Sequence, residues 1–365
     1  MSSQGIEQFK AALKEVNNKL LVITISLPVI VSFAEVYNLS LDVVYKKLVT
    51  FFNTLGVRAV FDTRFAYSLT RLLLTKELNA KTTNLPLIVT ECSAWLLYAI
   101  KKLHKDLLPS LSLVKSQQKL MGFLIKEVVK DKLIKEFFKD YTNEELVEEN
   151  NTSGEEHKEI KEILHIAICQ CNDKKVESTL DKESKKEVDL IITAKELHEY
   201  ITQPFNSIKP IDTPYSITQF LPTSFPYKEI TNTTLGYIYG ISEQTLKFTT
   251  AGNKDFRIAE IVLSDSKKIK GVLAGGYRNI QKILASVKSG KCAHDYIEIY
   301  ACPGECWGGA GLLDIEGRLA DKVKTGDEDY ANAALKYLNE HPTIINMLKS
   351  KPIEKKEEGV SSLSW

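Results

Sequence analysis

Short apolar runs alternate with amphipathic segments along the first part of the chain. The apolar runs are rich in β-branched residues and have the length of buried strands. We expect strands at Leu20–Ile25, Val57–Phe61 and Leu85–Thr90. Hydrophobic residues recur at helical spacing between and after these runs, which predicts helices at residues 39–55, 66–78, 93–107 and 116–138. This alternation is typical of a parallel sheet with crossover helices.

The alternation resumes in the second half, after an acidic and polar stretch at residues 143–161 that we expect to be a solvated connection. Strands are expected at His165–Ile168, Val188–Thr193, Arg257–Leu263, Lys268–Leu273 and Tyr296–Tyr300. Helices are expected at residues 194–201, 278–288 and 328–350. Residues 202–227 contain five prolines and are expected to form mainly loops.

The pattern as a whole predicts an α/β fold. We expect two lobes, residues 1–150 and 151–327, each a small, mostly parallel sheet flanked by helices. A C-terminal helix at residues 328–350 and a flexible tail at residues 351–365 are expected to follow.

Composition narrows the class of protein. The chain has 365 residues with 48 Lys and Arg against 47 Asp and Glu, a net charge of +1, which argues against nucleic acid as a direct partner. The apolar run Leu20–Tyr37 contains Pro28 and Glu35 and is shorter than the roughly 20 clean residues of a membrane helix. The polar N-terminus does not resemble a secretory signal. We therefore expect a protein of the cytoplasm, with the nucleus as a second location, and no membrane partner.

Cysteines follow several predicted strands. Cys92, the pair Cys169 and Cys171, and Cys302 lie at or just beyond a strand end, and Cys306 comes four residues after Cys302. Ligands of open α/β sheets bind at the carboxyl ends of the strands, so these side chains can converge. Thiols stay reduced in the cytosol, where clustered cysteines favour a metal site over disulfides. The alternative is that they are small buried hydrophobic residues.

Glycines surround the last two cysteines. Gly304, Gly308 and Gly309 let the backbone approach a bound group closely. A helix beginning near a cysteine would also direct backbone N–H groups at an anionic cluster. These residues are therefore candidates for the surroundings of a metal cluster.

Sequence motifs around the cysteines resemble those of a known family. The stretch YIEIYACPGECWGGAG, residues 296–311, resembles the ACPxGCxNGGG motif of the iron-only hydrogenase family. TECSAW at residues 90–95 is similar to TSCCPGW of that family, and CQCNDKKVE at residues 169–177 to MPCxxKKxE. The resemblance covers roughly residues 20–315. It is closest to the non-hydrogenase branch of cytosolic iron–sulfur assembly factors, also called nuclear prelamin A recognition factor-like proteins.

The resemblance implies a fold and a set of ligands. It implies a 4Fe–4S cluster, in a cleft between the two lobes, bound by four thiolates: Cys92, Cys171, Cys302 and Cys306. Cys171 is preferred because Cys169 falls on the methionine of the family motif. Cys292 matches a cysteine outside the ligand set. Lys174 matches a lysine that faces the di-iron unit of hydrogenases, and we expect it here to be a cation beside an anionic cluster.

Departures from the motifs bear on activity. Glu91 stands where the resemblance places a proton-relaying cysteine, and no cysteine precedes Cys92 to bind the N-terminal clusters of related proteins. We therefore expect a non-enzymatic factor that binds one cluster and links an early scaffold complex to the delivery of clusters to apoproteins. Two alternatives stay open: an oxidoreductase of the hydrogenase type, and an adaptor that binds no cluster.

The C-terminal residues suggest a partner. Leu363, Ser364 and Trp365 resemble the C-terminal signal that engages the cytosolic iron–sulfur targeting complex, through its β-propeller subunit and associates. A terminal indole is a strong contact residue, and a chain-end carboxylate is readily bound by backbone or basic groups. The alternative is a tail that ends in tryptophan by chance. Client apoproteins would be served indirectly.

Overall fold

The fold was analysed in a computed structural model of the chain. The residues that the structure describes are 2–16, 18–57, 59–80, 86–137, 162–179, 186–201, 204–212, 214–220, 249–262 and 268–313. They form two compact units, each built from separate stretches of sequence. The first unit takes its described residues from Met1–Thr70, Ser116–Thr233 and Cys306–Glu340. The second unit takes them from Arg71–Lys115 and Thr234–Glu305.

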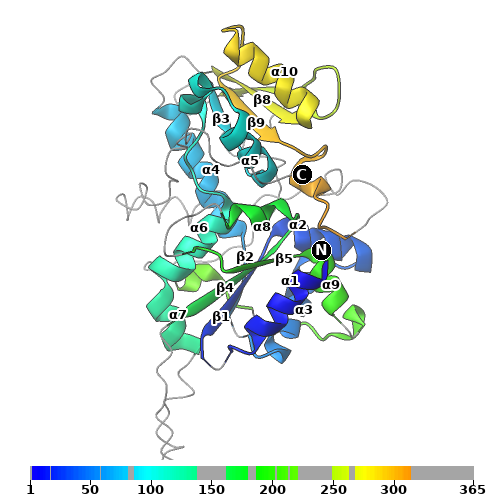
Figure 1. Ribbon diagram of the computed structural model, residues 1–365. Helices are drawn as coiled ribbons and strands as arrows, with labels where there is room; N and C mark the ends of the chain where they lie inside the picture. The colour runs from blue at the N-terminus through cyan, green and yellow to red at the C-terminus, as the bar shows by residue number, and fades with distance from the viewer. Residues whose placement is uncertain are drawn as a thin grey trace, which may run out of the picture. The chain divides into compact units, whose positions relative to one another are not determined.

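A parallel sheet of four strands forms the centre of the first unit (Figure 1). Its order is β2-β1-β4-β5, and every neighbouring pair is parallel. The strands are β1 (Leu20–Ile25), β2 (Ala59–Asp62), β4 (Ile163–Cys169) and β5 (Leu190–Thr193). The helices are α1 (Ser2–Leu13), α2 (Leu27–Tyr37), α3 (Leu41–Thr54), α4 (Arg64–Asn79, which continues into the second unit), α6 (Gln117–Phe123), α7 (Lys130–Phe137), α8 (Asp173–Glu177) and α9 (Ala194–Tyr200).

The second unit contains a mixed sheet of five strands. Its order is β3-β9-β8-β7-β6; β3, β9 and β8 are parallel, whereas β7 and β6 run antiparallel to their neighbours. The strands are β3 (Leu87–Val89), β6 (Thr249–Thr250), β7 (Phe256–Val262), β8 (Lys268–Gly275) and β9 (Tyr296–Tyr300). The helices are α5 (Ser93–Lys102) and α10 (Tyr277–Lys288). Short 3-10 segments occur at Lys105–Ser110, Phe205–Ser207, Ile217–Gln219 and Glu305–Gly308, and a π segment at Leu124–Val128.

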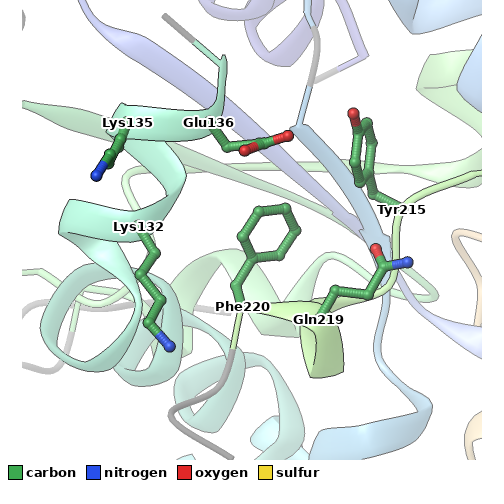
Figure 2. A pocket seen from close by; sticks show the side chains of 6 residues that line it. All are labelled: Lys132, Lys135, Glu136, Tyr215, Gln219 and Phe220. Carbon is green, nitrogen blue, oxygen red and sulfur yellow. The ribbon is translucent and has the colours of Figure 1, made fainter. Parts of the chain in front are cut away.

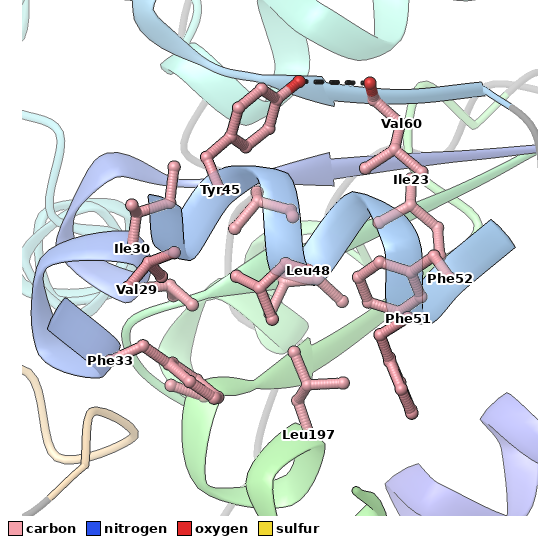
Figure 3. Close-up of a cluster of buried hydrophobic side chains, with 14 of the residues drawn as sticks. Ile23, Val29, Ile30, Phe33, Tyr45, Leu48, Phe51, Phe52, Val60 and Leu197 are labelled. Carbon is pink, nitrogen blue, oxygen red and sulfur yellow. Dashed lines mark hydrogen bonds between the residues drawn. The ribbon is translucent and has the colours of Figure 1, made fainter. Parts of the chain in front are cut away.

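Each unit has its own hydrophobic core. In the first unit, one face of the sheet packs against α1, α2, α3 and α9 through residues such as Ile23, Phe33, Leu48 and Leu197. Figure 3 shows this cluster, with the Tyr45 hydroxyl donating to the carbonyl of Val60 at 3.2 Å. In the second unit, α5 and α10 pack on one face of the sheet. Burial of these side chains is the main favourable contribution to folding of each unit.

Local signals explain several helix ends. The Ser40 hydroxyl accepts the backbone N–H of Val43 at the start of α3. Thr193 and Glu196 form a capping box at the start of α9. Asn38 ends α2 in the left-handed conformation, which asparagine tolerates better than most residues. Each of these ends is fixed by residues at the helix terminus itself.

The expected fold class is confirmed, and the strands lie close to their expected positions. The expected lobe boundaries, residues 150 and 327, do not coincide with the units of the structure. The reason is that β3 pairs with β9 in the second unit and not with the other N-terminal strands. The expected helix at residues 328–350 and the tail at residues 351–365 lie outside the described residues.

Several helical segments differ from expectation, and no helix was expected where α2 and α8 lie. The polar N-terminus forms α1, whose Phe9 is fully buried against Phe52 and Tyr200. The helix expected at residues 93–107 ends at Lys102, and the one expected at residues 116–138 is divided by the π segment. Among the described residues, no single helix is long and apolar enough to cross a membrane; only α2 and α3 together meet that criterion, and they are bent by 103°.

Candidate metal centre

Cys92 and Cys302 follow adjacent strands at one edge of the sheet in the second unit. Cys92 is the N-cap of α5, directly after β3, and Cys302 follows β9, which pairs with β3 in parallel. The backbone N–H of Ala301 donates to Cys92 Sγ at 3.3 Å. The Thr90 hydroxyl donates to the carbonyl of Ile299 at 2.8 Å. The structure therefore brings the ends of the two cysteine-bearing strands together, within one sheet rather than in two lobes.

Cys302 begins a tight turn. The N–H of Glu305 donates to the carbonyl of Cys302 at 3.2 Å, and Gly304 between them has a φ of 73°. Proline at the second position and a positive-φ glycine at the third are typical of a type II turn. The N–H of Gly304 also donates to Asp255 Oδ1 at 3.0 Å. The expected need for glycine at position 304 thus has a backbone cause.

Cys171 and Cys306 lie on segments that meet in the first unit. Residue 171 follows the end of β4, and the segment after Cys306 crosses that strand end. The N–H of Gly311 donates to the carbonyl of Gln170 at 3.0 Å. A Cβ atom on Gly309 would lie 2.4 Å from the same oxygen, so only glycine allows this approach.

The structure separates the two cysteines at the end of β4. Cys169 is buried in a small hydrophobic cluster, and its thiol donates to Gln118 Oε1 at 3.3 Å. Cys171 is only partly buried. Cys169 therefore belongs to the core of the first unit, and the choice of Cys171 as the ligand stays a prediction. Cys292 lies on the loop before β9, apart in sequence from the four predicted ligands. Its thiol is 3.7 Å from the carbonyl oxygen of His294.

Lys174 has an acidic partner one helical turn away. Its Nζ lies 3.1 Å from Glu177 Oε2, and the two side chains are only 2% and 3% exposed. Glu177 also accepts hydrogen bonds from Ser116 Oγ at 2.6 Å and Gln118 Nε2 at 3.4 Å. The lysine expected to stand beside an anionic cluster therefore belongs to a buried network that already contains one carboxylate.

The four predicted ligands divide between the units as two pairs. Cys92 and Cys302 belong to the second unit, and Cys171 and Cys306 belong to the first. All four are partly buried, and the first pair has a backbone N–H directed at sulfur. Among these residues, no three His, Cys, Asp or Glu side chains are arranged to hold a metal ion. The remaining predicted residues, Leu363, Ser364 and Trp365, lie outside the described residues.

Burial strongly affects one histidine outside these pairs. His165 is a fully buried residue within β4, and desolvation lowers its pKa from the usual value to about 4. Its ring nitrogens lie 2.9 Å from Thr24 Oγ1 and 2.8 Å from the carbonyl oxygen of Glu187. The neutral ring therefore satisfies both hydrogen bonds inside the core, and it is a structural residue.

A pocket in the first unit contains none of the predicted site residues. It lies between α7 and the segment around residues 215–220 (Figure 2). The side chains that line it are Lys132, Lys135, Glu136, Tyr215, Gln219 and Phe220. The rings of Tyr215 and Phe220 belong to an aromatic cluster with Phe137. Nothing in this lining resembles a thiolate site.

Sequence reasoning missed a group of charged residues beside the Cys302 turn. Glu305 is buried and forms an ion pair with Arg257 on β7, and Asp255 accepts the N–H of Gly304. The one available signal was the motif itself, because Glu305 stands at the glycine position of ACPxGC.

Comparison with known proteins identifies the family. The chain matches the family described as the iron only hydrogenase large subunit, C-terminal domain, over residues 19–140 and 150–310. The chain belongs to this family, and the resemblance seen in its motifs is confirmed.

Two curated relatives carry assembly-factor names. A protein of Anopheles gambiae named "Probable cytosolic Fe-S cluster assembly factor" is 27% identical over 332 residues, which cover 84% of this chain and 64% of that protein. A Xenopus tropicalis protein named as a cytosolic Fe-S cluster assembly factor is 26% identical over 91% of this chain and 71% of its own length. The chain thus spans less than two thirds of the Anopheles protein's length.

A solved structure shows the same fold. The apo FeFe-hydrogenase HydA1 from Chlamydomonas reinhardtii, as a variant, matches with a TM-score of 0.65 and 19% identity. The match covers 90% of this chain and 88% of that protein. At this level of identity the likeness concerns the fold.

Proposed function

We propose that the chain is a cytosolic iron–sulfur protein assembly factor that binds one 4Fe–4S cluster through Cys92, Cys171, Cys302 and Cys306. The observation that carries this proposal is the pairing of Cys92 with the end of β9, where Ala301 N–H donates to Cys92 Sγ at 3.3 Å. The names of the relatives support a role in assembly. The proposal requires the second pair, Cys171 and Cys306, to supply the other two thiolates.

Each residue would have a defined task. A bound cubane supplies four irons and four sulfides that can be passed to an apoprotein. Cys92 and Cys302 would bind from neighbouring strand ends, where Ala301 N–H reduces the negative charge on one sulfur. The N-terminus of α5 would add a favourable field at Cys92. Cys171 and Cys306 would bind from segments held together by the Gly311–Gln170 hydrogen bond.

Metal content tests the cluster directly. We would reconstitute the protein anaerobically and measure iron, acid-labile sulfide and the EPR spectrum for wild type and Cys306→Ala. About four irons per wild-type chain are expected, with loss in the variant. Cys292→Ala is the matched control and should keep its iron, since this thiol lies outside both pairs. Cys169→Ala should also keep its iron, whereas Cys171→Ala should not. A wild-type chain without iron would leave a docking protein that binds no cluster.

The partners form a second, separable part of the proposal. We infer that Leu363, Ser364 and Trp365 dock the cytosolic targeting complex and that other surfaces receive clusters from an early scaffold. Trp365→Ala should abolish pull-down of the targeting complex and leave iron content unchanged. Unchanged pull-down would reject the docking role of the tail without touching the cluster.

The alternative activity has its own test. The fold is shared with FeFe-hydrogenases, so reduction of a dye by hydrogen gas should be assayed with the reconstituted protein. We expect none, because the ammonium of Lys174, the lysine that the resemblance places toward the di-iron unit of hydrogenases, is paired here with the buried carboxylate of Glu177. Dye reduction that depends on hydrogen would overturn the non-enzymatic proposal.

A further inference from the structure

Glu305 has an unusual combination of backbone conformation and burial. Its φ is 61°, in the left-handed region, and the residue is only 4% exposed. Among the described non-glycine residues, only Asn38 shares a positive φ, and Asn38 ends a helix, where this conformation is common. Glutamate is disfavoured there because its Cβ crowds the backbone. Something else must therefore hold Glu305 in this conformation.

An ion pair with Arg257 supplies that contact. The guanidinium of Arg257, on β7, is paired with Glu305 Oε1, and the arginine side chain is 17% exposed. A buried carboxylate needs such a partner because desolvation would otherwise destabilise its charged form. The pair joins residues 48 positions apart in sequence, so it attaches the turn that contains Glu305 to strand β7 of the sheet.

A second contact from the same strand end supports the turn. Asp255, just before β7, accepts the N–H of Gly304 through Oδ1 at 3.0 Å. The carbonyl of Asp255 also accepts the N–H of Gly275, at the end of β8, at 2.7 Å. A Cβ on Gly275 would lie 3.4 Å from the carbonyl oxygen of Cys302. The turn between Cys302 and Cys306 is thus held against the ends of β7 and β8.

We propose that Arg257 and Glu305 are positioning residues that fix the turn between Cys302 and Cys306 and so set how slowly the protein releases a bound cluster. This inference rests on the proposed function, because it concerns the same two thiolates. The motif glycine at this position would adopt the left-handed conformation without help. Glutamate in its place makes the conformation depend on Arg257, so the spacing of the two ligands is coupled to the sheet.

Four variants test the coupling. The reconstituted chain would be mixed with an iron chelator under native conditions. The rate of iron release would then be measured for Arg257→Met, Glu305→Gly, the double variant and Arg257→Lys. Arg257→Met should release iron about tenfold faster than wild type, a change within the range of coupled neighbouring residues. When Glu305→Gly is already present, adding Arg257→Met should change the rate little. Arg257→Lys should release iron more slowly than Arg257→Met, since it keeps the charge.

Two controls separate positioning from general stability. Ile283→Val reduces the packing of the hydrophobic core under α10 without touching the turn and should leave the release rate unchanged. Glu260→Gln removes an exposed ion pair of β7 and should also have no effect. Faster release in these controls as well would assign the effect to loosened folding and overturn the positioning role.

The outcomes distinguish this inference from the proposed function. A wild-type chain that binds no iron overturns the cluster proposal and, with it, the role of the pair in cluster release. If the wild-type chain binds about four irons and Arg257→Met releases iron at the same rate as wild type, only the positioning role is overturned. Equal effects of Arg257→Met with and without Glu305→Gly would also overturn it, because the two residues would then act independently.

Discussion

The two units each place a buried ion pair beside a predicted cysteine ligand, but the pairs are built differently. In the first unit, Lys174 and Glu177 are one turn apart on the short helix α8 and are almost completely buried. In the second unit, Arg257 and Glu305 come from distant parts of the sequence. The first pair can form once helix α8 has formed, whereas the second pair requires β7 and the segment after β9 to be packed together. The first ion pair therefore depends on local structure and the second on tertiary structure.

The largest expected effect is loss of the local pair. Lys174→Met would leave the carboxylate of Glu177 buried without its cation, which should lower the free energy of unfolding of the apoprotein by about 4 kcal/mol. Urea unfolding measures this change. The double variant Lys174→Met with Glu177→Leu should recover most of the loss, because no buried charge is then left unpaired. A double variant as unstable as the single one would show that the network with Ser116 and Gln118 matters more than the ion pair.

The next largest effect is expected at one of two glycines, Gly309 in the first unit and Gly304 in the second. Gly309→Ala would place a Cβ 2.4 Å from the backbone oxygen of Gln170. The backbone must then shift, and we expect a loss of about 3 kcal/mol in unfolding free energy, at the upper end for overpacking. Gly304→Ala meets no neighbour within 4 Å but must adopt a φ of 73°. That substitution should destabilise by only about 1 kcal/mol. The reverse order in urea unfolding would contradict the steric explanation.

These two glycines show what the sequence could predict at the site. The strand-end argument said that cysteines after parallel strands can converge, and Cys92 and Cys302 follow β3 and β9, which pair in one sheet. Closely spaced glycines signalled a close approach of the backbone, and Gly309 makes one. The partner oxygen, on Gln170, could not be predicted, since it depends on how a segment more than a hundred residues away crosses β4.

The fold was predictable to a similar depth. Composition and periodicity located β1 and β9 at their observed bounds, because buried strands need short apolar runs. The pairing of β3 with β9 was not predictable, since hydrophobic runs carry no label for their partners. Helix α1 was missed because its sequence, SSQGIEQFKAAL, is mostly polar and has few large apolar residues. One of them, Phe9, inserts between Phe52 and Tyr200. The Arg257–Glu305 pair was missed because the sequence likewise does not show which distant residues become neighbours.

The next smaller effect is a pH dependence of the free energy of unfolding, to which a histidine in each unit contributes. His165, in the first unit, has a pKa lowered to about 4 by burial, with Lys126 lowering it further and Asp189 opposing. The unfolded chain binds a proton near pH 6.5 that the folded chain excludes, so stability is full above that pH and falls as pH decreases toward 4. Between about pH 6.5 and pH 5 the loss should be about 2 kcal/mol. Urea unfolding at several pH values measures it.

The second unit supplies the comparison for that measurement. Half-burial also lowers the pKa of His294, in the same direction. His165→Gln should remove most of the pH dependence in this range, whereas His294→Gln should remove less. Equal slopes in wild type and His165→Gln would show that the ring is protonated in the folded protein.

The smallest effect concerns a strand that carries both kinds of ion pair. Glu260 on β7 pairs with Lys268 on β8 at 2.8 Å, but the lysine and glutamate side chains are 72% and 52% exposed. Water and salt screen such a pair, and two flexible side chains must be ordered to form it. Lys268→Gln should therefore leave the urea midpoint unchanged within error, at both low and high salt. Arg257 lies three residues from Glu260 on the same strand, yet its partner Glu305 is buried, so Arg257→Met should shift the midpoint clearly. If both substitutions had equal effects, burial would not be what distinguishes the two pairs, and the coupling of the Cys302 turn to β7 would need another cause.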